Sequence, residues 1–443
     1  MSSATIVPLR NTLALRLLRG RGAPALFDQI LISGANFLAN IVLVRGLGLH
    51  EFGKYSIAYI LLLYANGTQM SFVTQPMLSV APLLDGTDRR AFINGMLTIQ
   101  LMASSILCLV FALAGMTLRI FNPFYSLSAV CAIALSVGAF QLQDWLRRYY
   151  FLVNKTKLAI VSDFISYVLQ LIVLVVLWRT GHLTLTSAFI TIFTTSMAAI
   201  VMGPLTDRFH PTIRHLGKAW GRCRILSRDL VIAEQVRWFG LQGLLLFASN
   251  IVGVAEAGGL RATQGLAGPV NLVITSFENV VPIRVAEELK SNGANSAMKY
   301  AARVISTCLL VFGPLILVIA FTGRPLLRLL FGPALLMFYV PMVLQLVIVL
   351  AQIVTRIWNH LFRGLQDSRA LLWGNALSTA GCLIPVYSFG RAWGATGIVL
   401  ASLCGQLVLI IFCVIRWRSM RLHYEELYPE CSQVRCTGEF QQI

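Results

Sequence analysis

The stretch FDQILISGANFLANIVLVRGLGLHEFGKYSIAYILLLYANGTQMSFVTQP, residues 27–76, decides the fold of this chain. It predicts two apolar helices joined by a tight turn whose glycines include Gly48 and Gly53. The first helix carries Asn36 and Asn40, which are four residues apart and therefore share one helical face. Polar side chains in a membrane span normally face the interior of a helix bundle or a wet cavity. The stretch therefore predicts a membrane-embedded bundle with a polar interior face.

The same pattern returns later in the chain. At an offset of 205 positions, LGLHEFGKYSIAYIL (residues 47–61) aligns with VGVAEAGGLRATQGL (residues 252–266). The residues that coincide in the turn are Gly48 with Gly253, Glu51 with Glu256, and Gly53 with Gly258. A constant offset with matching turn glycines favours a protein built from one duplicated unit.

The composition indicates a polytopic membrane protein. Hydrophobic residues make up 57% of the chain and charged residues only 12%, with a mean hydropathy of +0.74. Soluble domains carry about a quarter of their residues as charges. A membrane span needs roughly 20 apolar residues, and the chain offers about twelve. The predicted spans are 25–46, 55–79, 92–115, 124–145, 157–178, 184–203, 234–254, 261–282, 301–322, 329–355, 369–389 and 394–415.

The net charge of +18 is explained by the distribution of lysine and arginine over the predicted loops. With both termini in the cytoplasm, 28 of the 36 basic residues lie inside, as the positive-inside rule requires. The eight outside are Arg45, Lys54, Arg119, Arg179, Arg261, Arg324, Arg328 and Arg391. Nucleic-acid binding is therefore not needed to explain the charge, and we expect no nucleic-acid partner.

The predicted fold class is an all-α polytopic membrane protein, with about twelve transmembrane helices in two six-helix lobes. Six spans per lobe make the repeat parallel, about an axis along the membrane normal. The expected parts are a basic cytoplasmic N-terminus (1–24), an N-lobe (25–205), a basic cytoplasmic linker (206–233), a C-lobe (234–416) and a cytoplasmic tail (417–443). Within the linker, Trp220–Leu230 would form either a basic amphipathic helix on anionic headgroups or a solvated connection.

Nothing in the sequence predicts catalysis. The outside loops are short, the nine cysteines are scattered, and no metal-ligand cluster or Walker-type glycine loop is present. We therefore expect no enzymatic activity, no cofactor and no metal site. The apolar segment after the first arginines is longer than a signal-peptide core and lacks a cleavage site, so we expect it to stay as a membrane anchor.

Three segments carry a resemblance to a known family. They are D-Q-x3-S-x2-N-F with R-x-L-G-x3-F-G-x-Y (Asp28–Tyr55), RRYYFLVNKTKLAIVSD (Arg147–Asp163), and FRGLQDSRALLWGNALS with WGATGIVLASLCGQ (Phe362–Gln406). Together they resemble the polysaccharide-repeat (O-antigen and exopolysaccharide) flippases of the multidrug/oligosaccharidyl-lipid/polysaccharide exporter superfamily.

The resemblance implies two six-helix lobes around a cavity that opens alternately to either side of a bacterial inner membrane. The implied cargo is an undecaprenyl-pyrophosphate-linked oligosaccharide repeat unit, which passes from the cytoplasmic to the outer leaflet for polysaccharide export. Polysaccharide polymerase or export proteins would be its partners in the pathway. The alternative is an ion-coupled multidrug or small-solute antiporter. The excess of basic over acidic residues near the spans argues against a cavity for organic cations.

A pyrophosphate cargo needs fixed cations, because arginine pairs with phosphate oxygens through two parallel hydrogen bonds. Arg45 and Arg237 are the preferred candidates, followed by Lys54 and Arg261; each could instead anchor a helix at the membrane interface. Amide side chains would bind the sugars or hydrogen-bond between helices. The candidate amides are Asn36, Asn40, Gln75, Gln242 and Asn250.

Acidic residues in the predicted spans are few: Asp28, Asp163 and Glu278. Any of them could exchange H⁺ or Na⁺ and so couple transport to an ion gradient. Glu278 is the preferred coupling residue. Asp28 and Asp163 lie near the predicted inner face, where Asp163 would pair with Arg147 or Arg148.

Overall fold

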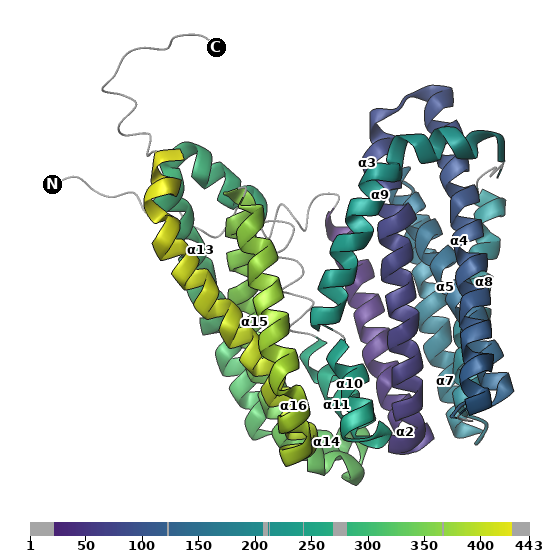
Figure 1. The fold of residues 1–443 in the computed structure, drawn as a ribbon. Coiled ribbons are helices and arrows are strands. Elements are labelled where there is room, and N and C mark those ends of the chain that lie inside the picture. The colour runs from purple at the N-terminus through teal and green to yellow at the C-terminus, as the bar shows by residue number, and fades with distance from the viewer. Residues whose placement is uncertain are drawn as a thin grey trace. The chain divides into compact units, whose positions relative to one another are not determined.

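The structure is a computed structural model that describes residues 22–121, 124–206, 211, 213–241, 243–268, 281–365 and 367–427. Throughout this part of the chain every regular element is a helix (Figure 1). Eight of these helices are long and apolar enough to cross a membrane. The predicted all-helical, multi-pass membrane architecture is therefore confirmed.

The chain divides into two compact units. Unit 1 comprises Met1–Ala39 and Ala65–Leu230, and unit 2 comprises Asn40–Tyr64 and Val231–Ile443. The long helix α2 (Gly22–Gln69) belongs to both, because its middle part packs in unit 2 and its ends in unit 1.

Unit 1 continues from α2 through a π-helical turn, η1 (Met70–Thr74), which leads into α3 (Gln75–Val80) and η2 (Ala81–Leu83). Its remaining elements are α4 (Gly86–Phe121), α5 (Leu127–Leu152), α6 (Thr156–Asp163), η3 (Phe164–Leu169), α7 (Gln170–Arg179), α8 (Leu185–Thr206) and the first part of α9 (Ile213–Leu241). Helix α5 packs between α4 and α8 (Figure 1). It begins where the Ser126 hydroxyl caps the helix by accepting the Ala129 backbone N–H.

Unit 2 is built on three long helices, α13 (Val281–Phe321), α15 (Tyr339–Gly364) and α16 (Ser368–Leu427), with α15 in contact with both others (Figure 1). The shorter elements are α10 (Gly243–Ile251), α11 (Val254–Gln264), η4 (Gly265–Ala267), α14 (Gly323–Phe331) and η5 (Pro333–Phe338). Helix α10 packs on α16 and α11 packs on α15.

Two of the eight membrane-spanning candidates are long enough to cross twice. They cover Ile30–Val80 and Arg369–Leu427, with 51 and 59 residues. Each contains a kink at a left-handed glycine, Gly48 (φ 74°) and Gly394 (φ 56°), at the position where the sequence predicts a turn or a boundary between two spans. The predicted spans 234–254 and 261–282 fall on shorter helices and on residues outside the described part of the chain. The layout of twelve spans stays a prediction.

The two copies of the repeated turn share their backbone geometry and touch each other within unit 2. Gly48 and Gly253, the aligned glycines, both have positive φ, at 74° and 107°. A Cβ on Gly258 would lie 2.8 Å from the carbonyl oxygen of Leu49, and one on Gly53 would clash with the carbonyl of Val254. Leu49 aligns with Val254 at the 205-residue offset, so the contact is reciprocal. Reciprocal contact is what two copies related by a twofold axis make, which supports the predicted duplication.

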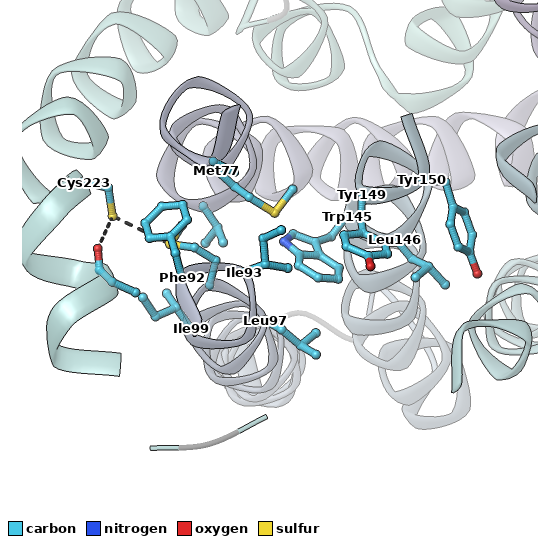
Figure 2. Packing of buried hydrophobic residues seen from close by; sticks show 14 of the residues in the cluster. Met77, Phe92, Ile93, Leu97, Ile99, Trp145, Leu146, Tyr149, Tyr150 and Cys223 are labelled. Carbon is cyan, nitrogen blue, oxygen red and sulfur yellow. Dashed lines mark hydrogen bonds between the residues drawn. The ribbon is translucent and has the colours of Figure 1, made fainter. Parts of the chain in front are cut away.

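The core of unit 1 lies among α3, α4, α5 and the first part of α9 (Figure 2). Met77, Phe92 and Trp145 are buried there together with Cys223 of α9. Helix α9 runs through the whole of Trp220–Leu230, so that segment is a helix with a packed face rather than a solvated connection. The large buried side chains come from α3, α4 and α5, and α9 packs against them through the small residues Ala219 and Cys223.

A second core holds unit 2 together around α10, α11, α15 and α16. Ile60, Trp238, Leu260 and Val386 are buried in it, and the Tyr64 ring lies 4.5 Å from the Trp238 ring between centroids. This core positions the segment around residue 60 beside α11, which carries Arg261.

Candidate substrate and ion-coupling sites

A buried network of charges lies in unit 1, between α5 and the end of α6. The Arg147 Nε donates to the Asp163 carboxylate at 2.5 Å, and Arg148 donates to Asp144 at 3.0 Å. Gln143 donates a further hydrogen bond to Asp163 at 3.3 Å. The Asp163 side chain is fully buried, so only this pairing makes its charge tolerable in an apolar bundle.

The polar surroundings of Asp163 are incompletely satisfied. The hydroxyls of Ser162 and Ser166, the amide oxygen of Gln143 and the whole amide of Gln141 are buried without a hydrogen-bond partner among the described residues. The helix also changes to the π form directly after Asp163, at η3. Such single π turns widen the backbone and are frequent at functional sites. The region therefore offers a carboxylate and several free oxygens, which is the chemistry that a proton or a small cation needs.

A second polar chain in unit 1 runs across the π turn η1. The Gln69 amide donates to Thr74 at 3.0 Å and to Gln100, and Gln100 donates to Ser104 at 2.8 Å. Gln69, Thr74 and Gln100 are all buried. Gln75, a predicted sugar ligand, is half-buried and begins α3 at the end of this chain.

In unit 2, Arg261 is a half-buried cation with no carboxylate partner among the described residues. Its Nη1 donates a long hydrogen bond of 3.4 Å to Gln264. Its charge interacts with the hydroxyls of Tyr55 and Tyr59, whose rings stack at 5.6 Å between centroids. A guanidinium that is half-buried and lacks a counter-charge is suited to bind an anion.

The local sequence explains how Arg261 reaches this place. Helix α11 starts after the left-handed Gly253, and the adjacent Gly258 and Gly259 give it a face without side chains. That face lies against Leu49 and Gly53 on one side and against the Phe338 ring on the other. Arg261 follows one turn later, so its position depends on this close approach.

Two of the predicted phosphate ligands are already occupied. Arg45 donates to the carbonyl oxygens of Leu329 and Leu330, at 2.7 Å from its Nε to Leu330. These carbonyls end α14, and a cation there caps the helix and complements its dipole. Lys54 pairs with Glu51 at 2.8 Å, one helical turn away. Both side chains therefore act as anchors in this structure, as the interfacial alternative expects.

The remaining predicted amides are spread out. Asn36 and Asn40 are half-buried on α2, and both make further interactions. Asn250 is exposed on α10.

Several predicted residues lie beyond what the structure describes. Gln242 and Glu278 lie outside the described residues, so their roles stay predictions. Asp28 lies on α2 and Arg237 on α9, but their side chains are outside the description.

The sequence reasoning did not select Tyr55, Tyr59 or Glu256. The two tyrosines are four residues apart and so share a helical face, which is the signal that could have placed them together. Glu256 is the repeat partner of Glu51, but the position equivalent to Lys54 is Gly259, and the Glu256 Oε2 is buried without a hydrogen-bond partner among the described residues. The aligned sequences therefore show that Glu256 lacks the lysine that pairs with Glu51 in the first copy.

No protein-family model matches the chain, and no curated protein matches it. Several solved structures share its fold at low sequence identity. The lipid II flippase MurJ in an inward closed conformation aligns with a TM-score of 0.65 and 13% identity, over 89% of this chain and 87% of MurJ. A point mutant of VcmN, a MATE transporter of Vibrio cholerae, aligns with a TM-score of 0.62 and 12% identity, over 90% and 95% of the two chains.

A third structure is a transporter of the MOP superfamily from Pyrococcus furiosus. It aligns with a TM-score of 0.60 and 11% identity, over 94% of this chain and 99% of that one. These proteins are similar to the chain along almost its whole length. The chain therefore has the fold shared by the MOP-superfamily transporters MurJ and MATE.

Proposed function

We propose that this protein is a flippase for undecaprenyl-pyrophosphate-linked oligosaccharide repeat units. It would move them from the cytoplasmic to the outer leaflet of a bacterial inner membrane by alternating access, for polysaccharide export. Arg261 carries the proposal, because it is a half-buried cation without a carboxylate partner in the described part of the chain. A pyrophosphate supplies the missing anion and can engage a guanidinium through two hydrogen bonds.

The fold and the charge distribution support the same function. MurJ is a lipid flippase of this fold, so the architecture is compatible with moving a lipid-linked anion. An apolar protein with a net charge of +18 and few acids in its predicted spans favours an anionic cargo over a cationic one. Two six-helix lobes, with both termini in the cytoplasm, remain part of the proposal.

Ion coupling is the second element of the proposal, with Asp163, Asp28 and Glu278 as its candidates. The polar atoms without partners around Asp163 support that residue. Glu278→Gln should reduce transport under an imposed H⁺ or Na⁺ gradient and leave the gradient-free rate unchanged. Asp163→Asn should also reduce gradient-driven transport, together with a loss of stability, because it removes the carboxylate that pairs with Arg147. Transport by Glu278→Gln equal to wild type, with and without the gradient, would remove Glu278 from the proposal.

An ion-coupled multidrug antiporter is the competing function, favoured by the MATE likeness and the buried acid Asp163. Proteoliposomes that contain the protein separate the two. A fluorescent polyprenyl-pyrophosphate oligosaccharide and ethidium are offered in parallel, each with and without an ion gradient. The proposal expects movement of the lipid-linked sugar and no ethidium transport. Ethidium transport without sugar-lipid movement would establish the antiporter instead.

A further inference from the structure

A basic pocket of about 590 Å³ lies in unit 1, between the beginning of α4 and the first turns of α9. Its lining shares no residue with the Asp163 network, and the proposed transport function does not use it. Its cations are Arg90 from α4 and Lys218 and Arg222 from α9, and His215 and Asn94 also line it. The size is within the range of small-molecule sites.

Close helix packing fixes the walls of this pocket. A Cβ on Gly95 of α4 would lie 2.7 Å from the Ala219 Cβ and 2.8 Å from the His215 carbonyl, so only glycine allows this approach. Ala219 and Cys223 of α9 are buried against α4. The ring of Trp220, also on α9, lies 5.2 Å from the Phe72 ring between centroids. With this face of α9 packed, Lys218 and Arg222 are held on its solvent side, one turn apart (the packed face is seen in Figure 2).

The charge of the pocket is strongly positive. Three cations face a single acid, Asp88, whose ion pair with Arg222 spans 3.4 Å between side chains that are 69% and 42% exposed. Exposed ion pairs of this kind contribute little, so Arg222 remains available to another anion. The pocket also includes Thr87 in the first turn of α4, where backbone N–H groups attract negative charge.

The apolar surface beside the pocket indicates that the anion is carried by a lipid. Met102, Ile106, Leu109 and Leu113 form an exposed apolar stripe on α4. Ala91 lies 11 residues before Met102, about three turns earlier on the same face. The pocket therefore lies about three turns before this exposed stripe on the same helix, with the buried Gly95 and Thr98 between them.

The same arrangement continues on α9. Ile225 is 63% exposed and follows Lys218 and Arg222 on the same face, seven and three residues later. A cationic pocket followed by the exposed Ile225 matches a phosphate headgroup with an acyl chain beside it.

We propose that the pocket between α4 and α9 binds the phosphate headgroup of an anionic phospholipid of the adjoining leaflet. Arg90, Lys218 and Arg222 hold the phosphate, and the apolar faces of α4 and α9 receive the chains. The bound lipid would fix the linker helix α9 to the membrane surface. This site does not depend on the identity of the transported cargo.

Native mass spectrometry of the full-length protein in detergent tests the proposal. Phosphatidylglycerol, phosphatidylcholine and undecaprenyl pyrophosphate are titrated separately against wild type and two double variants. Lys218→Gln with Arg222→Gln removes two pocket cations. Arg224→Gln with Arg228→Gln removes two exposed cations from α9 outside the pocket and is the matched control.

We expect wild type to bind phosphatidylglycerol saturably and in preference to phosphatidylcholine. The pocket variant should lose affinity for it about tenfold or more, and the control less than about twofold. Arg90→Gln, on the other helix, should also weaken binding, while Lys218→Arg with Arg222→Lys should retain it. These two variants keep the test valid if the first double variant does not fold.

Equal losses in the pocket variant and the control would overturn the proposal, because they would indicate general attraction to a basic helix. Binding of undecaprenyl pyrophosphate without binding of phosphatidylglycerol would overturn it as well, because the pocket would then receive the cargo. The outcome is independent of the transport assay, so failure here leaves the proposed flippase function untouched.

Discussion

Arg147 in unit 1 and Arg261 in unit 2 occupy similar settings but have opposite electrostatic surroundings. Both are partly buried arginines on helices of an apolar bundle. Arg147 faces the buried carboxylate of Asp163 at 2.5 Å, whereas Arg261 forms no ion pair with a described carboxylate and donates a hydrogen bond to Gln264. Pairing with a carboxylate therefore separates the buried cations that serve the fold from those that remain available for a ligand. A neutralised charge holds helices together, and an unneutralised one can bind an anion.

Removing the counter-charge of Arg147 should have the largest effect on stability. Asp163→Ala removes the carboxylate 2.5 Å from Arg147 and leaves a longer pair of 4.0 Å with Asp144. We expect a loss of about 3–5 kcal/mol in the free energy of unfolding. Thermal or denaturant unfolding in a defined detergent measures it. Asp163→Leu with Arg147→Met removes both charges and should recover most of the loss. A single variant as stable as wild type would show that the pair carries no structural role.

The position of Arg261 can be disturbed without changing its charge. Gly258→Ala and Gly53→Ala each place a methyl group against the backbone of the other repeat copy, so we expect each to cost about 1–3 kcal/mol. Both should also reduce transport, because α11 carries Arg261 one turn further. Gly34→Ala on α2 is the control, since open space surrounds that glycine. Equal stability of all three variants would show that the close backbone contact at Gly53 and Gly258 does not hold α11 in place.

Asp367 in unit 2 is another acid that is paired with an arginine, and its side chain is less buried than that of Asp163. It accepts hydrogen bonds from Arg416 at 3.0 Å, from Tyr424 and from the Ala370 backbone. Burial raises the pKa of Asp367, but the hydrogen bonds from Tyr424, Ala370 and Arg416 outweigh it and hold the pKa below its ordinary value of 3.8. A depressed pKa gives stability that is present at neutral pH and is lost as the pH falls through the folded-state value.

Asp367→Asn should therefore lower stability at pH 7 by about 1.5–3 kcal/mol. The difference from wild type should be constant down to about pH 4 and shrink as the pH falls further. Unfolding midpoints measured between about pH 7 and about pH 3 test this. A difference that persists undiminished at the acid end of that range would mean that the ionised carboxylate is not what stabilises this helix end.

The sequence predicted those features that periodicity and charge encode locally. Apolar length fixed the membrane class, and the turn glycines Gly48 and Gly253 were found by alignment before their φ angles were known. Arg147 and Arg148 were both candidate partners of Asp163; the structure pairs Arg147 with it and gives Arg148 to Asp144. Arg147 and Asp163 are only 16 residues apart on consecutive helices, so a contact between them can be predicted from the sequence.

Other contacts could not be predicted, because they join distant parts of the chain through tertiary packing. Arg45 caps α14 by donating to the Leu329 carbonyl, 284 residues later in the sequence. No local sequence pattern identifies a backbone carbonyl as the partner of a particular arginine. The two tyrosines beside Arg261 become informative only when α11 lies next to α2. The pocket between α4 and α9 likewise depends on Gly95, whose lack of a side chain says nothing by itself about what approaches it.

In the proposed function, the unneutralised Arg261 receives the pyrophosphate of a lipid-linked cargo. Translocation of a fluorescent polyprenyl-pyrophosphate oligosaccharide in proteoliposomes tests it, with Arg261→Gln beside Arg45→Gln. We predict that Arg261→Gln keeps wild-type stability and loses transport roughly ten- to a hundredfold, the loss expected for a hydrogen-bonded charge contact. Arg45→Gln, which loses only a helix cap, should transport at close to the wild-type rate once its fold is verified. Wild-type transport by Arg261→Gln would contradict the account.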